Sequence, residues 1–268
     1  MDGLNQFHAE GRDSGKHFII HQNKEENINM SFKAKKDFCG LADGTSIVLK
    51  SHEEGRKGSQ ATCANDEGDV VDVTDFGHVM DPSNSYALKA DVTNLTITLG
   101  KVTTVNFGTE ASPANRYFML KSVSIGTSNS GEVSISAQSE EVPEAAAKRA
   151  YTVTVPKLRC RNKAQVLDSL FTLTGEKAHL QKADYTFSVE STITTVDGER
   201  VTWDVYGGKV ECSVEAKQAG SAIPTFEAGS SDTLITVLTG DNSESRPDSD
   251  YSTVKATITR YLKPDAEG

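Results

Sequence analysis

Apolar and polar residues alternate over short segments through most of the chain, which is the pattern of strands with one buried face. Leu95, Ile97 and Leu99, for example, are separated by threonines. A further strand at 45–50 follows the turn signal Asp43-Gly44. The sequence therefore predicts an all-β fold, with strands near residues 69–73, 86–92, 95–99, 101–107, 117–125, 132–137 and 151–157, then 185–190, 192–196, 200–206, 209–216, 222–227, 233–238 and 252–261.

A second pattern is an internal similarity with a period of about 100 residues. Residues 101–108 (KVTTVNFG) resemble residues 200–207 (RVTWDVYG), and residues 86–91 match 185–190 at the same offset. Many identities are Thr, Ser or Val, so chance similarity between two β-rich segments is the alternative. We predict a duplication, with two tandem β-sandwich or β-barrel domains at 31–158 and 159–268 and an extended N-terminal arm at 1–30.

Several segments outside the strand pattern carry their own predictions. Residues 56–59 and 109–117 are expected to be loops, 140–148 a linker, and 164–171 a short amphipathic helix, with a strand as the alternative. His17 and His21 have helical spacing but no third ligand, so we expect no metal site there. The acidic segment 240–250 has oxygen ligands for calcium without the EF-hand spacing, which favours a solvated loop. Trp203 is the single tryptophan and is expected in the core.

Charge is unevenly distributed along the chain, whose net charge is −10. Residues 63–142 contain four basic and eleven acidic side chains, which discourages nonspecific binding to nucleic acid. A basic cluster follows, in which four residues share one parity and would point the same way on a strand. It fits a solvated edge strand, a surface that docks an acidic patch of another subunit, or a nucleic-acid site without stacking aromatics. The predicted subunit interface pairs Lys157, Arg159, Arg161 and Lys163 with Asp66, Glu67, Asp69, Asp72 and Asp75.

Sequence motifs for catalysis are missing: there is no nucleophile elbow, phosphate-binding glycine loop, zinc-protease motif or dinucleotide fingerprint. Four dispersed cysteines lack metal-ligand spacing and are expected to be free, mostly buried thiols. No stretch has the length or apolarity of a signal peptide or membrane span, so we expect synthesis in a cytoplasm and no membrane partner. The chain is predicted to be non-enzymatic and to need no cofactor or metal.

The two β-rich repeats at 60–158 and 159–262, with the arm at 1–30, the loop at 109–117 and the helix at 164–171, resemble tailed-bacteriophage virion proteins of the tail-tube kind. This resemblance is architectural and rests on no signature motif. It implies a virion subunit made in a bacterial cytoplasm that assembles with itself into rings or stacked tubes, contacts other virion proteins, and passes DNA as cargo through an acidic lumen. Neck, tail-terminator, baseplate-hub and head-decoration proteins share these traits. A monomeric adhesion or carbohydrate-binding module is the alternative from another class.

Overall fold

The computed structural model describes residues 38–108, 112, 114–129, 131, 133–143, 149–160, 171–174, 178–196, 199–219, 225–228, 234–239, 243–245 and 251–265. The all-β prediction is confirmed, and no helix occurs within these ranges. The predictions for the arm at 1–30, His17, His21 and residues 164–170 lie outside them. The strands are β1 (Ile47–Ala64), β2 (Val70–Leu88), β3 (Val92–Leu99), β4 (Val102–Asn106), β5 (Asn115–Ser128), β6 (Ser134–Val142), β7 (Tyr151–Leu158), β8 (Phe171–Thr174), β9 (Ala178–Val196), β10 (Glu199–Ala219), β11 (Thr225–Ala228), β12 (Leu234–Thr239), β13 (Ser243–Ser245) and β14 (Tyr251–Leu262).

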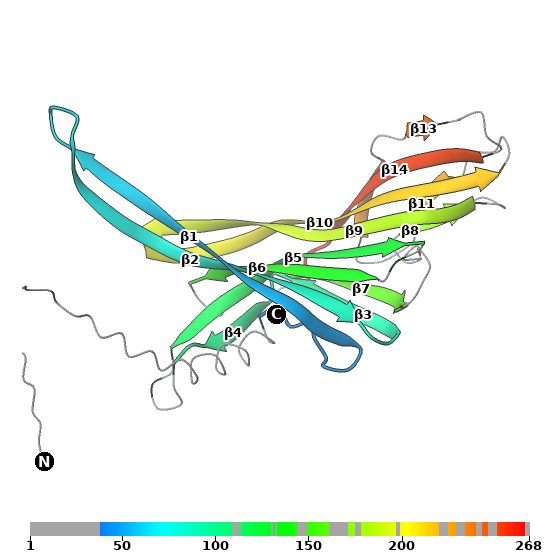
Figure 1. The fold of residues 1–268 in the computed structure, drawn as a ribbon, viewed down its shortest axis with the longest axis horizontal. Helices are drawn as coiled ribbons and strands as arrows, with labels where there is room; N and C mark the ends of the chain where they lie inside the picture. The colour runs from blue at the N-terminus through cyan, green and yellow to red at the C-terminus, as the bar shows by residue number, and fades with distance from the viewer. Residues whose placement is uncertain are drawn as a thin grey trace, which may run out of the picture.

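Ten of these strands form one large antiparallel sheet (Figure 1). Its order is β1-β2-β6-β5-β9-β10-β14-β12, with β4 added to β5 and β13 added to β14. Strands β3 and β7 pair separately, as do β8 and β11. The β3–β7 pair lies against one face of the large sheet, so the body of the molecule has two layers.

The large sheet runs without interruption through both predicted domains, because β5 pairs with β9. Register places Tyr86, Ile135, Ile125, Tyr185 and Cys212 in one row across five neighbouring strands, and all are buried. The buried residues of both halves therefore belong to one core.

The duplication and the domain boundary stay predictions from the sequence. Segments that match in sequence have different strand partners, since Tyr86 lies between β1 and β6 whereas Tyr185 lies between β5 and β10. The pairing thus gives the duplication no support.

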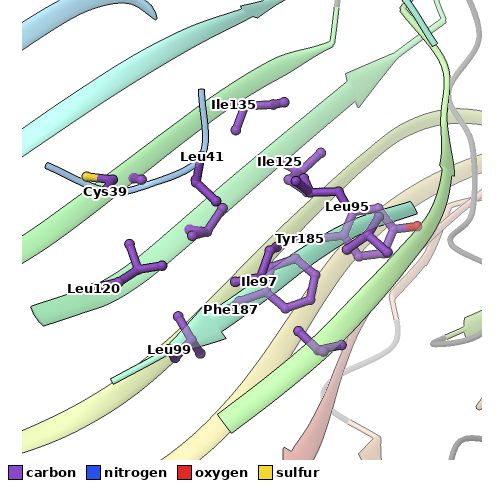
Figure 2. Close-up of a cluster of buried hydrophobic side chains, with 14 of the residues drawn as sticks. Cys39, Leu41, Leu95, Ile97, Leu99, Leu120, Ile125, Ile135, Tyr185 and Phe187 are labelled. Atoms are coloured by element: carbon purple, nitrogen blue, oxygen red, sulfur yellow. The ribbon is translucent and has the colours of Figure 1, made fainter. Parts of the chain in front are cut away.

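Apolar side chains of β3 fill the space between the two layers (Figure 2). Leu95, Ile97 and Leu99 are the apolar positions of the alternation, and all three are buried against Tyr185 and Phe187 of the large sheet. Alternation within β3 thus produces the burial that period-two patterning predicts.

A short segment before β1 seals one end of this core. Phe38 is buried and packs edge-on against Phe118, with ring centroids 4.5 Å apart, and against His52 of β1 at 5.1 Å. The predicted turn follows: Asp43 Oδ1 accepts hydrogen bonds from the backbone N–H groups of three residues up to Ile47, and these bonds hold the pKa of its carboxyl below the usual range.

The C-terminal end of the described chain fastens the two layers together. After β14 ends in the large sheet, the Asp265 carboxylate accepts hydrogen bonds from the Thr152 N–H at 3.1 Å and the Thr152 hydroxyl at 2.7 Å. The Asp265 N–H donates to the carbonyl of Ala150 at 2.8 Å. The start of β7 is thereby held to the segment that directly follows β14.

Several expected boundaries were wrong because the strands are longer than the sequence indicates. Residues 56–59, expected as a loop, lie within β1, and residues 140–142, expected as linker, end β6. Phe171, expected to end a helix, begins β8. Pairs of predicted strands also merge into β2, β9 and β10. A bulge at Gly207 and Gly208 lies within β10, and pairing with β9 continues on both sides of it. Gly207 has φ of 66°, and Gly208 packs directly on the Tyr151 ring.

Candidate assembly surfaces

Strands β1 and β2 form a long hairpin that extends well beyond the body of the molecule (Figure 1). Their pairing runs from Ile47–Leu88 to Ala64–Val70, whereas β2 pairs with β6 only over Ser83–Ala87. Among the described residues the outer part of the hairpin therefore has no third strand. We call residues 57–78 the arm; this segment is distinct from the N-terminal arm expected at residues 1–30.

The end of the arm is a defined acidic turn. Asn65 Oδ1 accepts hydrogen bonds from the N–H groups of Glu67 at 3.1 Å and Asp69 at 2.8 Å, and Gly68 adopts the left-handed conformation with φ of 89°. Asp66, Glu67, Asp69 and Asp72 are all exposed. Asp75 lies on β2 opposite Gln60, and its side chain falls outside the described part. The predicted acidic cluster is thus carried at the arm's end.

Apolar residues accompany these acids. Val70, Val71 and Val73 are 57%, 62% and 51% exposed. Val73 lies opposite Thr62 and Val70 opposite Ala64, so these four residues share one face of the ribbon, while Val71 is the extra residue of a bulge. The arm therefore ends in an apolar face bordered by carboxylates.

The predicted basic cluster lies at the end of β7. Lys157 and Arg159 are exposed, and β7 ends at Leu158, so Arg159 lies beyond the strand on which side chains of one parity would point the same way. Lys157, one residue before the end of β7, has φ of 49°, a left-handed conformation uncommon outside glycine. Arg161 and Lys163 lie outside the described residues.

The two clusters lie on opposite sides of the elongated molecule (Figure 1). The arm projects from one end, and β7 ends towards the other. Within one chain they do not meet, so a contact between them requires a second copy.

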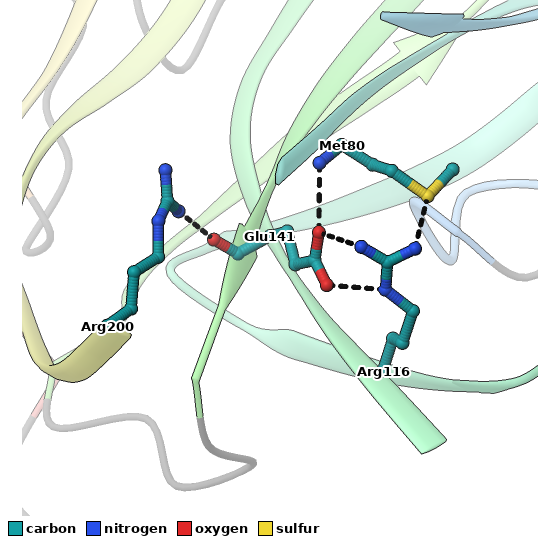
Figure 3. Close-up of polar contacts among 4 residues, drawn as sticks. All are labelled: Met80, Arg116, Glu141 and Arg200. Atoms are coloured by element: carbon teal, nitrogen blue, oxygen red, sulfur yellow. Dashed lines mark hydrogen bonds and ion pairs between the residues drawn. The ribbon is translucent and has the colours of Figure 1, made fainter. Parts of the chain in front are cut away.

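A partly buried charged network secures the base of the arm (Figure 3). The Glu141 carboxylate accepts hydrogen bonds from Arg116 Nε at 2.5 Å and Nη2 at 2.6 Å, and from the Met80 N–H of β2 at 2.9 Å. Arg200 of β10 donates to the Glu141 carbonyl at 2.6 Å. Four strands, β2, β5, β6 and β10, are joined at this point, which fixes the base of the arm to the body.

The neighbouring Glu140 is also held as an anion. Burial raises its pKa, but hydrogen bonds from Ser191 at 2.6 Å and Lys121 at 2.9 Å, with the charges of Lys121 and Arg200, outweigh burial and leave the pKa below the usual range. Ser191 and Lys121 both donate to the same carboxylate oxygen, Oε2, and so fix the position of this side chain.

Free thiols do not provide a nucleophile in the core. All four cysteines are free, as predicted, although only Cys39 and Cys212 are buried; Cys63 is exposed. Burial raises the pKa of Cys39, and it raises the pKa of Cys212 to about 12. Both thiols are protonated at neutral pH, and a protonated thiol is a poor nucleophile.

The described residues hold neither a candidate metal site nor a membrane-spanning helix. They contain no group of His, Cys, Asp and Glu side chains arranged to hold a metal ion. The same ranges contain no helix long and apolar enough to span a membrane. No protein-family model matches the chain, and no curated protein matches it.

Proposed function

We propose that this chain is a non-enzymatic structural subunit that assembles with copies of itself in the virion of a tailed bacteriophage, as a ring-forming component of the tail tube through which DNA passes. The observation that carries self-assembly is the arm. The phage context rests on the architectural resemblance found in the sequence. The two-layer β body is compatible with that resemblance.

The arm favours assembly because it is poorly covered within one chain. Isolated two-stranded hairpins are marginally stable in water. Its three valines are each more than half exposed. Covering the exposed half of each would contribute about 1 kcal/mol per valine, or ~2–4 kcal/mol together. A neighbouring subunit would supply that cover.

Charge placement gives the contact a direction. An acidic arm at one end and Lys157 and Arg159 at the other suit a head-to-tail contact between copies, which can repeat into rings or stacks. A two-fold contact between two arms would instead bring like charges together. The proposed interface therefore joins the arm of one subunit to the end of β7 on the next.

Removing the outer arm tests this function directly. Ala61 pairs with Thr74, so replacing residues 62–73 by Asn-Gly should close the shortened hairpin with a two-residue turn. We expect the shortened protein to stay folded by circular dichroism but to remain a monomer in light scattering and electron microscopy. The full chain should form rings or tubes in the same measurements.

A finer variant replaces Val70, Val71 and Val73 with serine. Its matched control replaces Val196 and Val201, which are 52% and 49% exposed on the β9–β10 hairpin. Loss of assembly in the arm variant alone supports the proposal. A full-length chain that stays monomeric and binds glycans would instead identify an adhesion or carbohydrate-binding module.

A further inference from the structure

On the outer face of the large sheet, opposite the core, two rows of residues across β2, β6, β5 and β9 carry no charged side chain. Strand register arranges eight residues into two rows that cross β2, β6, β5 and β9, and seven of the eight bear hydroxyls. The rows are Ser85, Ser136, Ser124 and Thr186, and Ser83, Gln138, Ser122 and Ser188. We call these eight residues the hydroxyl face.

Side chains on this face are short and partly satisfied by each other. Ser124 Oγ lies 3.4 Å from Thr186 Oγ1, and Ser85 Oγ lies 2.5 Å from Ser51 Oγ on β1. All eight residues are at least partly exposed. Gln138 is the one longer side chain among the eight, and the other seven are short hydroxyl side chains.

Lysines occur only at the borders of the hydroxyl face, and each is neutralised by a carboxylate. Lys121 lies 2.9 Å from Glu140, Lys182 lies 2.5 Å from Asp184, and Lys209 lies 3.5 Å from Glu211. Glu53, opposite Ser83 on β1, adds a further negative charge. With these three ion pairs and Glu53, this part of the border is neutral to acidic.

Such a face adheres weakly to the common macromolecular partners. Serine is depleted in protein–protein interfaces, where aromatic residues, methionine and arginine are enriched. Affinity for nucleic acid comes mainly from lysine and arginine, which release counterions from the phosphates. A wide surface that lacks both kinds of residue suits a wall past which a polyanion must slide.

We propose that the hydroxyl face lines the channel of the assembled protein and that duplex DNA passes over it. This inference rests on the proposed tail-tube function and specifies which surface meets the DNA. It also changes the expected lumen from acidic to uncharged at its centre, with carboxylates at the borders.

The opposite side of the molecule is a weaker candidate for the channel wall. The outer face of β3–β7 carries threonines, including Thr154, but it is only two strands wide. It also ends at the exposed Lys157 and Arg159, whose charges would retain phosphates. We therefore assign this side to the outside of the ring.

Cysteine labelling distinguishes these placements. Ser136→Cys on the hydroxyl face and Thr154→Cys on the β3–β7 face are both made in a background with Cys63→Ser and Cys160→Ser, which removes the accessible thiols. Each protein is treated, as purified oligomer and as dissociated monomer, with N-ethylmaleimide and with a maleimide carried on a polymer wider than a DNA duplex.

For Ser136→Cys, we expect both reagents to label the monomer, and only N-ethylmaleimide to label the oligomer. Thr154→Cys should react with both reagents in both states. Oligomers in which Ser136→Cys reacts with the wide reagent would place the hydroxyl face outside, and protection from both reagents would place it in a subunit contact; either result overturns the inference alone. Failure to form any oligomer overturns the proposed function, and the channel with it.

Discussion

Reversing the basic charges at the end of β7 should weaken assembly at low salt. High salt should abolish the difference between the variant and the original protein. The variant replaces Lys157 and Arg159, both exposed, with glutamate. In the proposed contact these residues face the acids at the end of the arm on the next subunit, including Asp69 and Asp72. Reversal would convert two attractions into two repulsions.

The size of the effect follows from the exposure of all the groups involved. Two unit charges 4 Å apart in water interact by about 1 kcal/mol, and exposed ion pairs are measured at ~0.2–1 kcal/mol. Taking ~0.5 kcal/mol for each of two pairs, the change from attraction to repulsion is ~2 kcal/mol per contact. That corresponds to an affinity about 30-fold lower at low salt.

Light scattering against time, at several protein concentrations, would measure both the rate and the extent of assembly. Charge complementarity acts strongly on association rates, so the lag should lengthen more than the final extent falls. Near 0.5 M salt the screening length shrinks to ~4 Å, and the variant should then approach the behaviour of the original protein. Adding Asp69→Lys and Asp72→Lys should restore much of the low-salt rate.

A control must change net charge equally at another place. Lys101→Glu with Arg149→Glu does so, because both residues are exposed at the opposite end of the β3–β7 pair, where Leu99 pairs with Tyr151. If this control slows assembly as much as the β7 variant, net repulsion rather than a specific contact is responsible. If assembly is indifferent to the β7 reversal and to salt, the basic residues are only a solvated strand end.

Three other predictions concern the body and the hydroxyl face. Gly208→Ala should destabilise the fold by ~1–3 kcal/mol in urea denaturation, because the added methyl would overlap the Tyr151 ring. Glu140 has a lowered pKa in the folded state, so its contribution to stability should be full above an unfolded pKa of about 4.3 and be lost as pH falls through the folded pKa; Glu140→Gln should flatten this dependence in urea midpoints measured against pH. Ser124→Lys with Ser136→Lys should give the protein DNA affinity that weakens with salt, with a log–log slope steeper by about 2 in fluorescence anisotropy.

Local patterning predicted the strands that have one buried and one exposed face. Alternation in β3 placed Leu95, Ile97 and Leu99 inward, and burial of all three follows from it. Trp203 was correctly expected in the core. The same reasoning failed at residues 56–59, where Gly, Ser and charged residues read as a loop. A strand on which no second layer packs need not alternate apolar and polar residues, so residues 56–59 leave no period-two signal in the sequence.

Strand partners were beyond local patterning for a different reason. The pairing of β5 with β9 depends on registry between segments about 60 residues apart, and neither sequence encodes which edge it will occupy. The acidic cluster was recognised in the sequence, but its projection on an arm was not. The hydroxyl face was visible only as alternating serines, because its width depends on the lateral order of four strands.

The seam between β5 and β9 also sets an order for making the protein. When residues 1–158 have left the ribosome, β5 has its partner β6 on one side, but the edge that will bind β9 is still open. Tyr185 and Phe187, which complete the core beneath β3, are not yet synthesised. Nascent chains therefore pass through an interval in which a sheet edge and an unfinished apolar layer are both exposed, and at high expression that interval is when neighbouring chains can pair wrongly.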